Sequence, residues 1–106
     1  MTRINIGIDN NGVVCSPNGG HLRGRGNDQI VWESPHHPFT LHFALISGKG
    51  HPSWPFKESP QSVFQSAKPF EGTLAAVQDP KNPPAYKYTV VVDGHVPLDP
   101  IIIVDK

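Results

Sequence analysis

The 106-residue chain has a single cysteine, Cys15, and a single methionine, Met1. A disulfide joins two cysteines, so no disulfide can form within the chain. The segment Met1–Asn5 also lacks the apolar core of a signal peptide. Low cysteine content fits a reducing compartment, and we expect a cytoplasmic protein.

Charge is scarce and balanced. Nine basic and nine acidic residues give a formal net charge of zero, and the charged fraction of 17% is below the usual value of about a quarter. Proteins bind nucleic acids and anionic membranes through a basic excess, so we expect neither partner. No apolar run approaches the ~18 residues of a membrane-spanning helix. The low charge favours a surface covered by a protein partner or by self-association.

Turn-forming residues are abundant by contrast. Twelve prolines and ten glycines are spread between short apolar runs. This pattern indicates many turns rather than disorder. A chain of this length forms one domain by default, so we expect a single domain over residues 1–106.

The apolar runs alternate with period two, as strands do when one face is buried. Arg3–Asp9 alternates isoleucine with polar or small residues, and Asn11–Gly12 supplies a hairpin turn. A second hairpin is predicted at Asp93–Gly94, between Tyr86–Val92 and the β-branched run that ends the chain. Phe39–Ile46 is the clearest central strand. Its expected core face comprises Phe39, Leu41, Phe43 and Leu45, and its opposite face Thr40, His42 and Ala44.

These signals predict an all-β fold of seven to eight short strands. No amphipathic helix is convincing, although a single helical turn fits near Ser62–Phe64. Short strands joined by regular turns are typical of a two-sheet Greek-key sandwich, and a closed small barrel is the alternative.

Three segments carry a resemblance to known sandwiches. Gly26–Trp32 followed by Ser34–Pro38 resembles the front half of a cupredoxin, in which a "G-D-x-V-x-W" strand precedes a loop that ends in a histidine copper ligand. Leu98–Val104 resembles the last strand of small bacterial cupredoxin-like or immunoglobulin-like proteins of unknown role. The resemblance covers about half the chain and implies a cupredoxin-like or immunoglobulin-like sandwich.

The resemblance does not extend to the blue-copper ligands. Such a site needs a cysteine thiolate and two histidines, usually with a weak axial ligand such as methionine. In the family the cysteine and the second histidine share one late loop. Here Cys15 lies in the first quarter of the chain, and Asp79–Ala85 contains neither residue type.

A weaker resemblance concerns carbohydrate binding. Tyr86–Gly94 is similar to the "Y-x-F-x-V-D-G" strand of starch- and glycogen-binding modules, which stack sugar rings on exposed tryptophans. Trp32 and Trp54 would serve that purpose here. The "W-x-x-D" element that follows in the family is absent, since Val96–Leu98 stands in its place.

The six histidines suggest a metal site. His36, His37 and His42 lie close together in the sequence, and His51 follows. Neutral imidazoles suit zinc, copper or nickel, so the metal hypothesis takes a divalent transition metal as its cofactor. Surface histidines in loops are the alternative interpretation.

The long connection Ser47–Pro60 holds the most prominent exposed-aromatic candidate. Trp54 is flanked by Pro52 and Pro55, which stiffen the loop. Together with Phe56 and His51 it is a candidate for contact with a ligand or partner. The alternative is a plug that covers one end of the sandwich. Trp32 lies in the middle of a predicted strand, where burial in the core is expected.

Nucleophilic chemistry is weakly indicated. Cys15 closes a Val-Val-Cys run, where a small buried residue is the ordinary role, and no G-x-S-x-G elbow is present. Gly24–Gly26 with Arg23 offers backbone N–H groups and guanidiniums that suit a phosphate or carboxylate, with a flexible solvated loop as the alternative. We therefore expect a non-catalytic binding or interaction domain with no resident cofactor. A histidine-based metal protein and a carbohydrate-binding module are the alternatives.

Overall fold

The N-terminal alternation of isoleucines produces the first hairpin. β1 (Thr2–Asp9) pairs antiparallel with β2 (Gly12–Ser16), as predicted from Asn11–Gly12. Gly12 has a φ of 122°, and a Cβ there would lie 2.6 Å from the carbonyl oxygen of Val96. The turn therefore needs glycine both for its backbone angle and for the close approach of the neighbouring loop.

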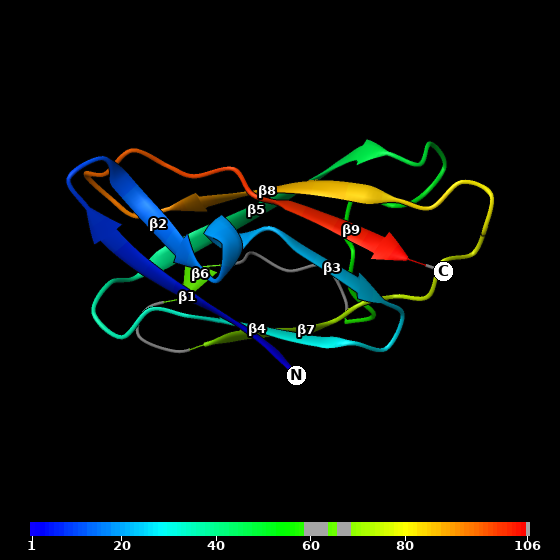
Figure 1. The fold of residues 1–106 in the computed structure, drawn as a ribbon, viewed down its shortest axis with the longest axis horizontal. Helices are drawn as coiled ribbons and strands as arrows, with labels where there is room; N and C mark the ends of the chain where they lie inside the picture. Colours follow the sequence, from blue (N-terminus) through cyan, green and yellow to red (C-terminus); the bar gives the residue numbers. More distant parts are fainter. Residues whose placement is uncertain (59–63, 66–68, 106) are drawn as a thin grey trace.

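Two open sheets make up the fold of the computed structural model, which describes residues 1–58, 64–65 and 69–105 (Figure 1). The first sheet has the order β2-β1-β4-β7, with β4 at Gln29–Glu33 and β7 at Phe70–Thr73. β1 and β4 run parallel, and the other pairs of this sheet are antiparallel.

The second sheet has five strands in the order β3-β9-β8-β5-β6. Its pairs are antiparallel except for β3 and β9, which run parallel. The strand bounds are Leu22–Arg25 for β3, Phe39–Ser47 for β5, Phe64–Gln65 for β6, Ala85–Val91 for β8 and Ile101–Asp105 for β9.

The first passage of the chain from the first sheet to the second is a short turn. β2 ends at Ser16, and the 3₁₀ segment η1 (Asn18–Gly20) leads into β3 at the edge of the other sheet. This three-residue segment is the only helix among the described residues, so no helix there could cross a membrane.

The core lies between the sheets and is rich in aromatic rings. Trp32 and Tyr88 are fully buried, and their ring centroids are 5.3 Å apart in an edge-to-face arrangement. Edge-to-face packing is favourable because the positive rim of one ring meets the negative face of the other. Phe43, Phe56 and Phe70 surround the same indole at centroid distances of 5.8–5.9 Å.

The predicted all-β two-sheet sandwich is confirmed. The predicted faces of Phe39–Ile46 are also confirmed, because Phe39 and Leu41 are buried whereas His42 is exposed. The nine described strands exceed the seven or eight expected, because the two-residue strand β6 was not anticipated. Ser62 and Val63, where we expected a helical turn, lie outside the described residues.

Candidate functional site

β9 carries apolar side chains on both of its faces. Ile102 and Val104 point into the sandwich and are 0% and 1% exposed. Ile101 and Ile103 alternate with them and are half-buried on the outer face. They provide the apolar lining of a surface groove, whereas Leu22 of β3, which pairs with Ile102, borders the groove but packs its side chain against the core.

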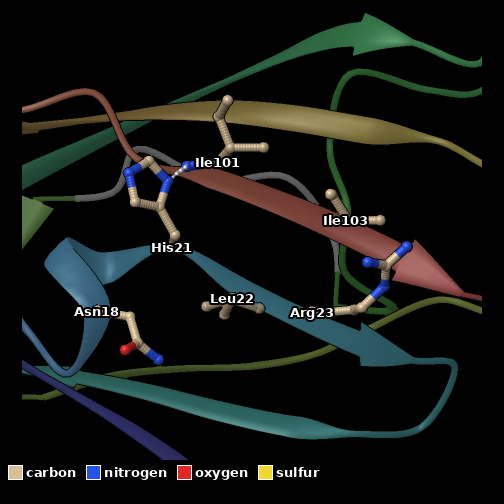
Figure 2. A pocket seen from close by; sticks show the side chains of 6 residues that line it. All are labelled: Asn18, His21, Leu22, Arg23, Ile101 and Ile103. Carbon is tan, nitrogen blue, oxygen red and sulfur yellow. Dashed lines mark hydrogen bonds between the residues drawn. The ribbon is translucent and has the colours of Figure 1, made fainter.

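The groove follows the edge of the second sheet. It has a volume of about 440 Å³ and is lined by Asn18, His21, Leu22, Arg23, Ile101 and Ile103 (Figure 2). Small-molecule sites typically enclose about 300–1,000 Å³ and are mainly apolar with a few placed polar groups. The volume of the groove lies in this range and its lining is mainly apolar, but the groove is shallow and open to solvent.

His21 borders the groove beside Ile101 (Figure 2). The backbone N–H of Ile101 donates to Nδ1 of His21 over 3.1 Å. Nδ1 must therefore act as an acceptor, which places the proton of the neutral imidazole on Nε2. This contact fixes both the ring and its tautomer at the start of β9.

Arg23 borders the groove beside Ile103. Its Nε lies 2.8 Å from Oδ2 and 3.0 Å from Oδ1 of Asp105. The two side chains are 66% and 36% exposed, so the ion pair adds little to stability, but it holds the guanidinium along β9. Figure 2 shows the terminal nitrogens of Arg23 pointing towards Ile103.

The motif Gly24–Gly26 is mostly strand rather than a free loop. Gly24 and Arg25 belong to β3 and pair with β9, and the Arg25 N–H donates to Oδ2 of Asp28 over 2.9 Å. The N–H groups of this segment therefore do not converge on one point. Of the residues considered for anion binding, Arg23 is the one that lines the groove.

The structure brings together three of the predicted contact residues. His51, Trp54 and Phe56 line one cavity of about 90 Å³ at the end of the sandwich that holds the connection after β5. His51 Nε2 lies 2.8 Å from the carbonyl oxygen of Asn82, and Trp54 Nε1 donates to the carbonyl oxygen of Glu58 over 2.6 Å.

The fourth predicted contact residue, Trp32, lies behind this cavity in the core. Its ring centroid is 5.8 Å from that of Phe56, and its side chain is 0% exposed. Trp32 therefore presents no face on which a sugar ring could stack. Trp54 is only partly buried, and its ring packs edge-to-face against Phe43 and Phe56.

The predicted metal ligands are not gathered into a three-residue site. His36 and His37 lie in the loop between β4 and β5, and His42 lies on the outer face of β5. Among the described residues, no group of three His, Cys, Asp or Glu side chains is placed to hold a metal ion. The structure instead brings His37 near His95, with ring centroids 6.1 Å apart.

Cys15 is a core residue. Its side chain is 7% exposed, and burial raises the pKa of its thiol to about 11. A thiol of this kind is neutral at physiological pH and therefore a poor nucleophile. Burial also raises the pKa of Tyr88 well above its ordinary value, and the Tyr88 hydroxyl donates to the carbonyl oxygen of Gly20.

Comparison with known proteins finds no matching family model, no matching curated protein and no matching solved structure.

Sequence reasoning missed most of the groove. His21, Leu22, Ile101 and Ile103 were not among the candidate contacts, although they line it together with Arg23. The sequence feature that could have indicated the groove was the uninterrupted apolar run Ile101–Val104. A strand with one solvated face alternates, whereas a continuous run indicates apolar residues on both faces.

Proposed function

We propose that the protein is a non-catalytic binding domain whose binding surface is the groove over β3 and β9. The observation that supports this most strongly is the groove itself, with its apolar lining of Ile101 and Ile103 and a volume of about 440 Å³. The polar side chains beside it are held by His21–Ile101 and Arg23–Asp105 contacts. Such preorganisation lowers the entropy lost on binding.

The test is a titration of the ¹⁵N-labelled protein with 1-octanol as an apolar probe, followed by amide chemical shifts. We expect shifts concentrated on Leu22–Arg25 and Ile101–Asp105. Ile103→Lys should remove the response because it places a charge in the apolar lining. Ile46→Lys is the matched control, since Ile46 is an exposed isoleucine of the same sheet, 52% exposed, that does not line the groove. Shifts elsewhere, or none at all, would overturn the proposal.

The cavity beside Trp54 is the second contact surface of this proposal. Its volume of about 90 Å³ is below the usual range for a small-molecule site but suits one inserted side chain of a protein partner. The low net charge, which does not oppose self-association, is consistent with a second copy in this role. Sedimentation velocity of the wild type and Trp54→Ala tests this contact, because the variant should shift the protein towards monomer.

A metal-binding function is the second candidate, and the His37–His95 pair favours it. Two imidazoles that share a metal at about 2.0–2.1 Å have centroids roughly 5–6.5 Å apart, depending on the angle at the metal. The observed separation of 6.1 Å lies in that range. We propose a cupredoxin-like or immunoglobulin-like sandwich, without the cysteine ligand, on the sequence resemblance of Gly26–Trp32 and Ser34–Pro38.

A thermal-shift titration with Zn²⁺, Cu²⁺ and Ni²⁺ tests this candidate. A metal that binds only the folded state raises Tm. His37→Ala and His95→Ala should each abolish the rise, whereas His42→Ala should preserve it. An unchanged Tm in the wild type, or an equal loss in His42→Ala, would exclude the His37–His95 site.

The remaining expectations belong to the same proposal. A formal net charge of zero gives no basic excess to attract nucleic acid, and the buried free thiol of Cys15 is compatible with the cytoplasm. We retain the expectation that the protein is not an enzyme. No observation favours the carbohydrate-binding alternative.

A further inference from the structure

The apolar lining of the groove lies between two different polar groups. Figure 2 shows His21 beside Ile101 and Arg23 beside Ile103, so the two side chains are placed towards opposite ends of the lining formed with β9. His21 offers a neutral N–H donor at Nε2, because its Nδ1 already accepts from Ile101. Arg23 offers a permanent positive charge.

The charge of Arg23 is only partly taken up by its neighbour. Both carboxylate oxygens of Asp105 contact Nε, at 2.8 and 3.0 Å. Within residues 1–58, 64–65 and 69–105, no hydrogen bond or ion pair is recorded for the two Nη groups. The Nη groups form the edge of a guanidinium that carboxylates engage with two parallel hydrogen bonds.

We propose that the groove binds an elongated apolar carboxylate of the medium-chain fatty-acid type, with its carboxylate on the Nη groups of Arg23 and its chain along Ile101 and Ile103. This inference rests on the binding function proposed above. The apolar lining selects the chain, and the cationic end selects the sign of the head group. Asp105 lies at the same end, so it opposes the carboxylate while it holds the guanidinium in place.

The experiment compares three eight-carbon probes that differ only in the head group: octanoate, 1-octanol and octylammonium. Each is titrated into the ¹⁵N-labelled protein at low ionic strength. We expect octanoate to bind up to about fivefold more tightly than 1-octanol, which is the factor that an exposed ion pair supplies. Octylammonium should bind most weakly, and added salt should reduce the advantage of octanoate.

Substitution of each of the two arginines on β3 tests which guanidinium binds the carboxylate. Arg23→Met keeps an apolar stem and should reduce the affinity for octanoate to that for 1-octanol. Arg25→Met is the matched control, because Arg25 is exposed and two residues further along the same strand face but does not line the groove. Asp105→Asn should raise the affinity for octanoate, because it removes the opposing charge.

The outcomes separate this inference from the function on which it rests. If 1-octanol binds as tightly as octanoate, or if Arg25→Met has the same effect as Arg23→Met, carboxylate selection is wrong and the apolar groove stands. If none of the three probes perturbs β3 and β9, both the inference and the groove function are overturned.

Discussion

The hydroxyl of Tyr88 donates a hydrogen bond to the carbonyl oxygen of Gly20, 68 residues away in the sequence. Tyr88 lies on β8 of the second sheet, and Gly20 ends the turn η1 through which the chain leaves the first sheet. Both residues are buried. This contact therefore joins the crossover turn to the central aromatic cluster in a region without competing water.

Tyr88→Phe should lower the free energy of unfolding by about 1–3 kcal/mol, because it leaves the buried Gly20 carbonyl without its partner. Tyr86→Phe is the control on the same strand. Tyr86 is 3% exposed against 0% for Tyr88, and it makes no side-chain hydrogen bond among the described residues, so its loss should be below about 0.5 kcal/mol. Urea denaturation measures both. Equal losses of unfolding free energy in the two variants would show that the Tyr88–Gly20 hydrogen bond does not stabilise the fold.

Stability should fall at alkaline pH because of Cys15. Its pKa is about 11 in the folded state against 9.0 for the free thiol. Between these values the unfolded chain loses its proton and the folded chain keeps it, so the stability present below pH 9 is lost as pH rises to 11. At about 1.4 kcal/mol per pKa unit, the loss is about 3 kcal/mol.

Urea unfolding at pH 8 and pH 11 measures this loss. Cys15→Ala should be less stable than the wild type at pH 8, because it leaves a small cavity. It should nevertheless lose less stability between the two pH values. Tyr88, whose pKa burial also raises, contributes in the same direction in both proteins. Parallel profiles for the two proteins would contradict the assignment to Cys15.

Two glycines in strands should respond oppositely to alanine. A Cβ on Gly72 would lie 2.6 Å from Cδ1 of Phe56, so Gly72→Ala must displace a buried ring and should cost about 1–3 kcal/mol. A Cβ on Gly7 would make an ordinary contact of 3.6 Å with Val14. Gly7→Ala should be neutral or stabilising, because glycine loses more backbone entropy on folding. Thermal unfolding measures the Tm of both variants. An equal fall in Tm for Gly7→Ala and Gly72→Ala would contradict the close packing of Gly72 against Phe56.

The two tryptophans should differ in their access to solvent. Trp54→Phe leaves only Trp32, which is 0% exposed, so its emission should be blue-shifted and insensitive to acrylamide. Trp32→Phe leaves only Trp54, which is partly buried and should be quenched to an intermediate degree. Comparable quenching in both variants would show that Trp32 is accessible.

Local pattern was sufficient to predict the hairpins and the strand faces. Period-two alternation identified the buried face of Phe39–Ile46 because a strand side chain has only two directions available. Pro97 and Pro100 precede β9, which begins at Ile101. Proline lacks the backbone N–H that a strand needs for hydrogen bonds to its neighbour. A strand boundary beside proline can therefore be recognised in a single sequence.

The neighbours of each strand could not be predicted in this way. β1 lies parallel to β4, and β3 lies parallel to β9, although each pair is separated by other strands in the sequence. Alternation records which face is buried but not which strand lies alongside. The groove depends on the second of these pairs, so its residues could not be assembled from the sequence. The approach of His37 to His95 depends on two loops meeting at one end of the sandwich, which alternation does not encode either.

The pairing of Leu22 with Ile102 also constrains how the protein is made. Among the described strands, β3 is hydrogen-bonded to β9 alone. β3 therefore stays without its partner until β9 has been synthesised, and the second sheet cannot take its full order before then. The exposed β3 edge is the segment that a chaperone would have to protect in the interval.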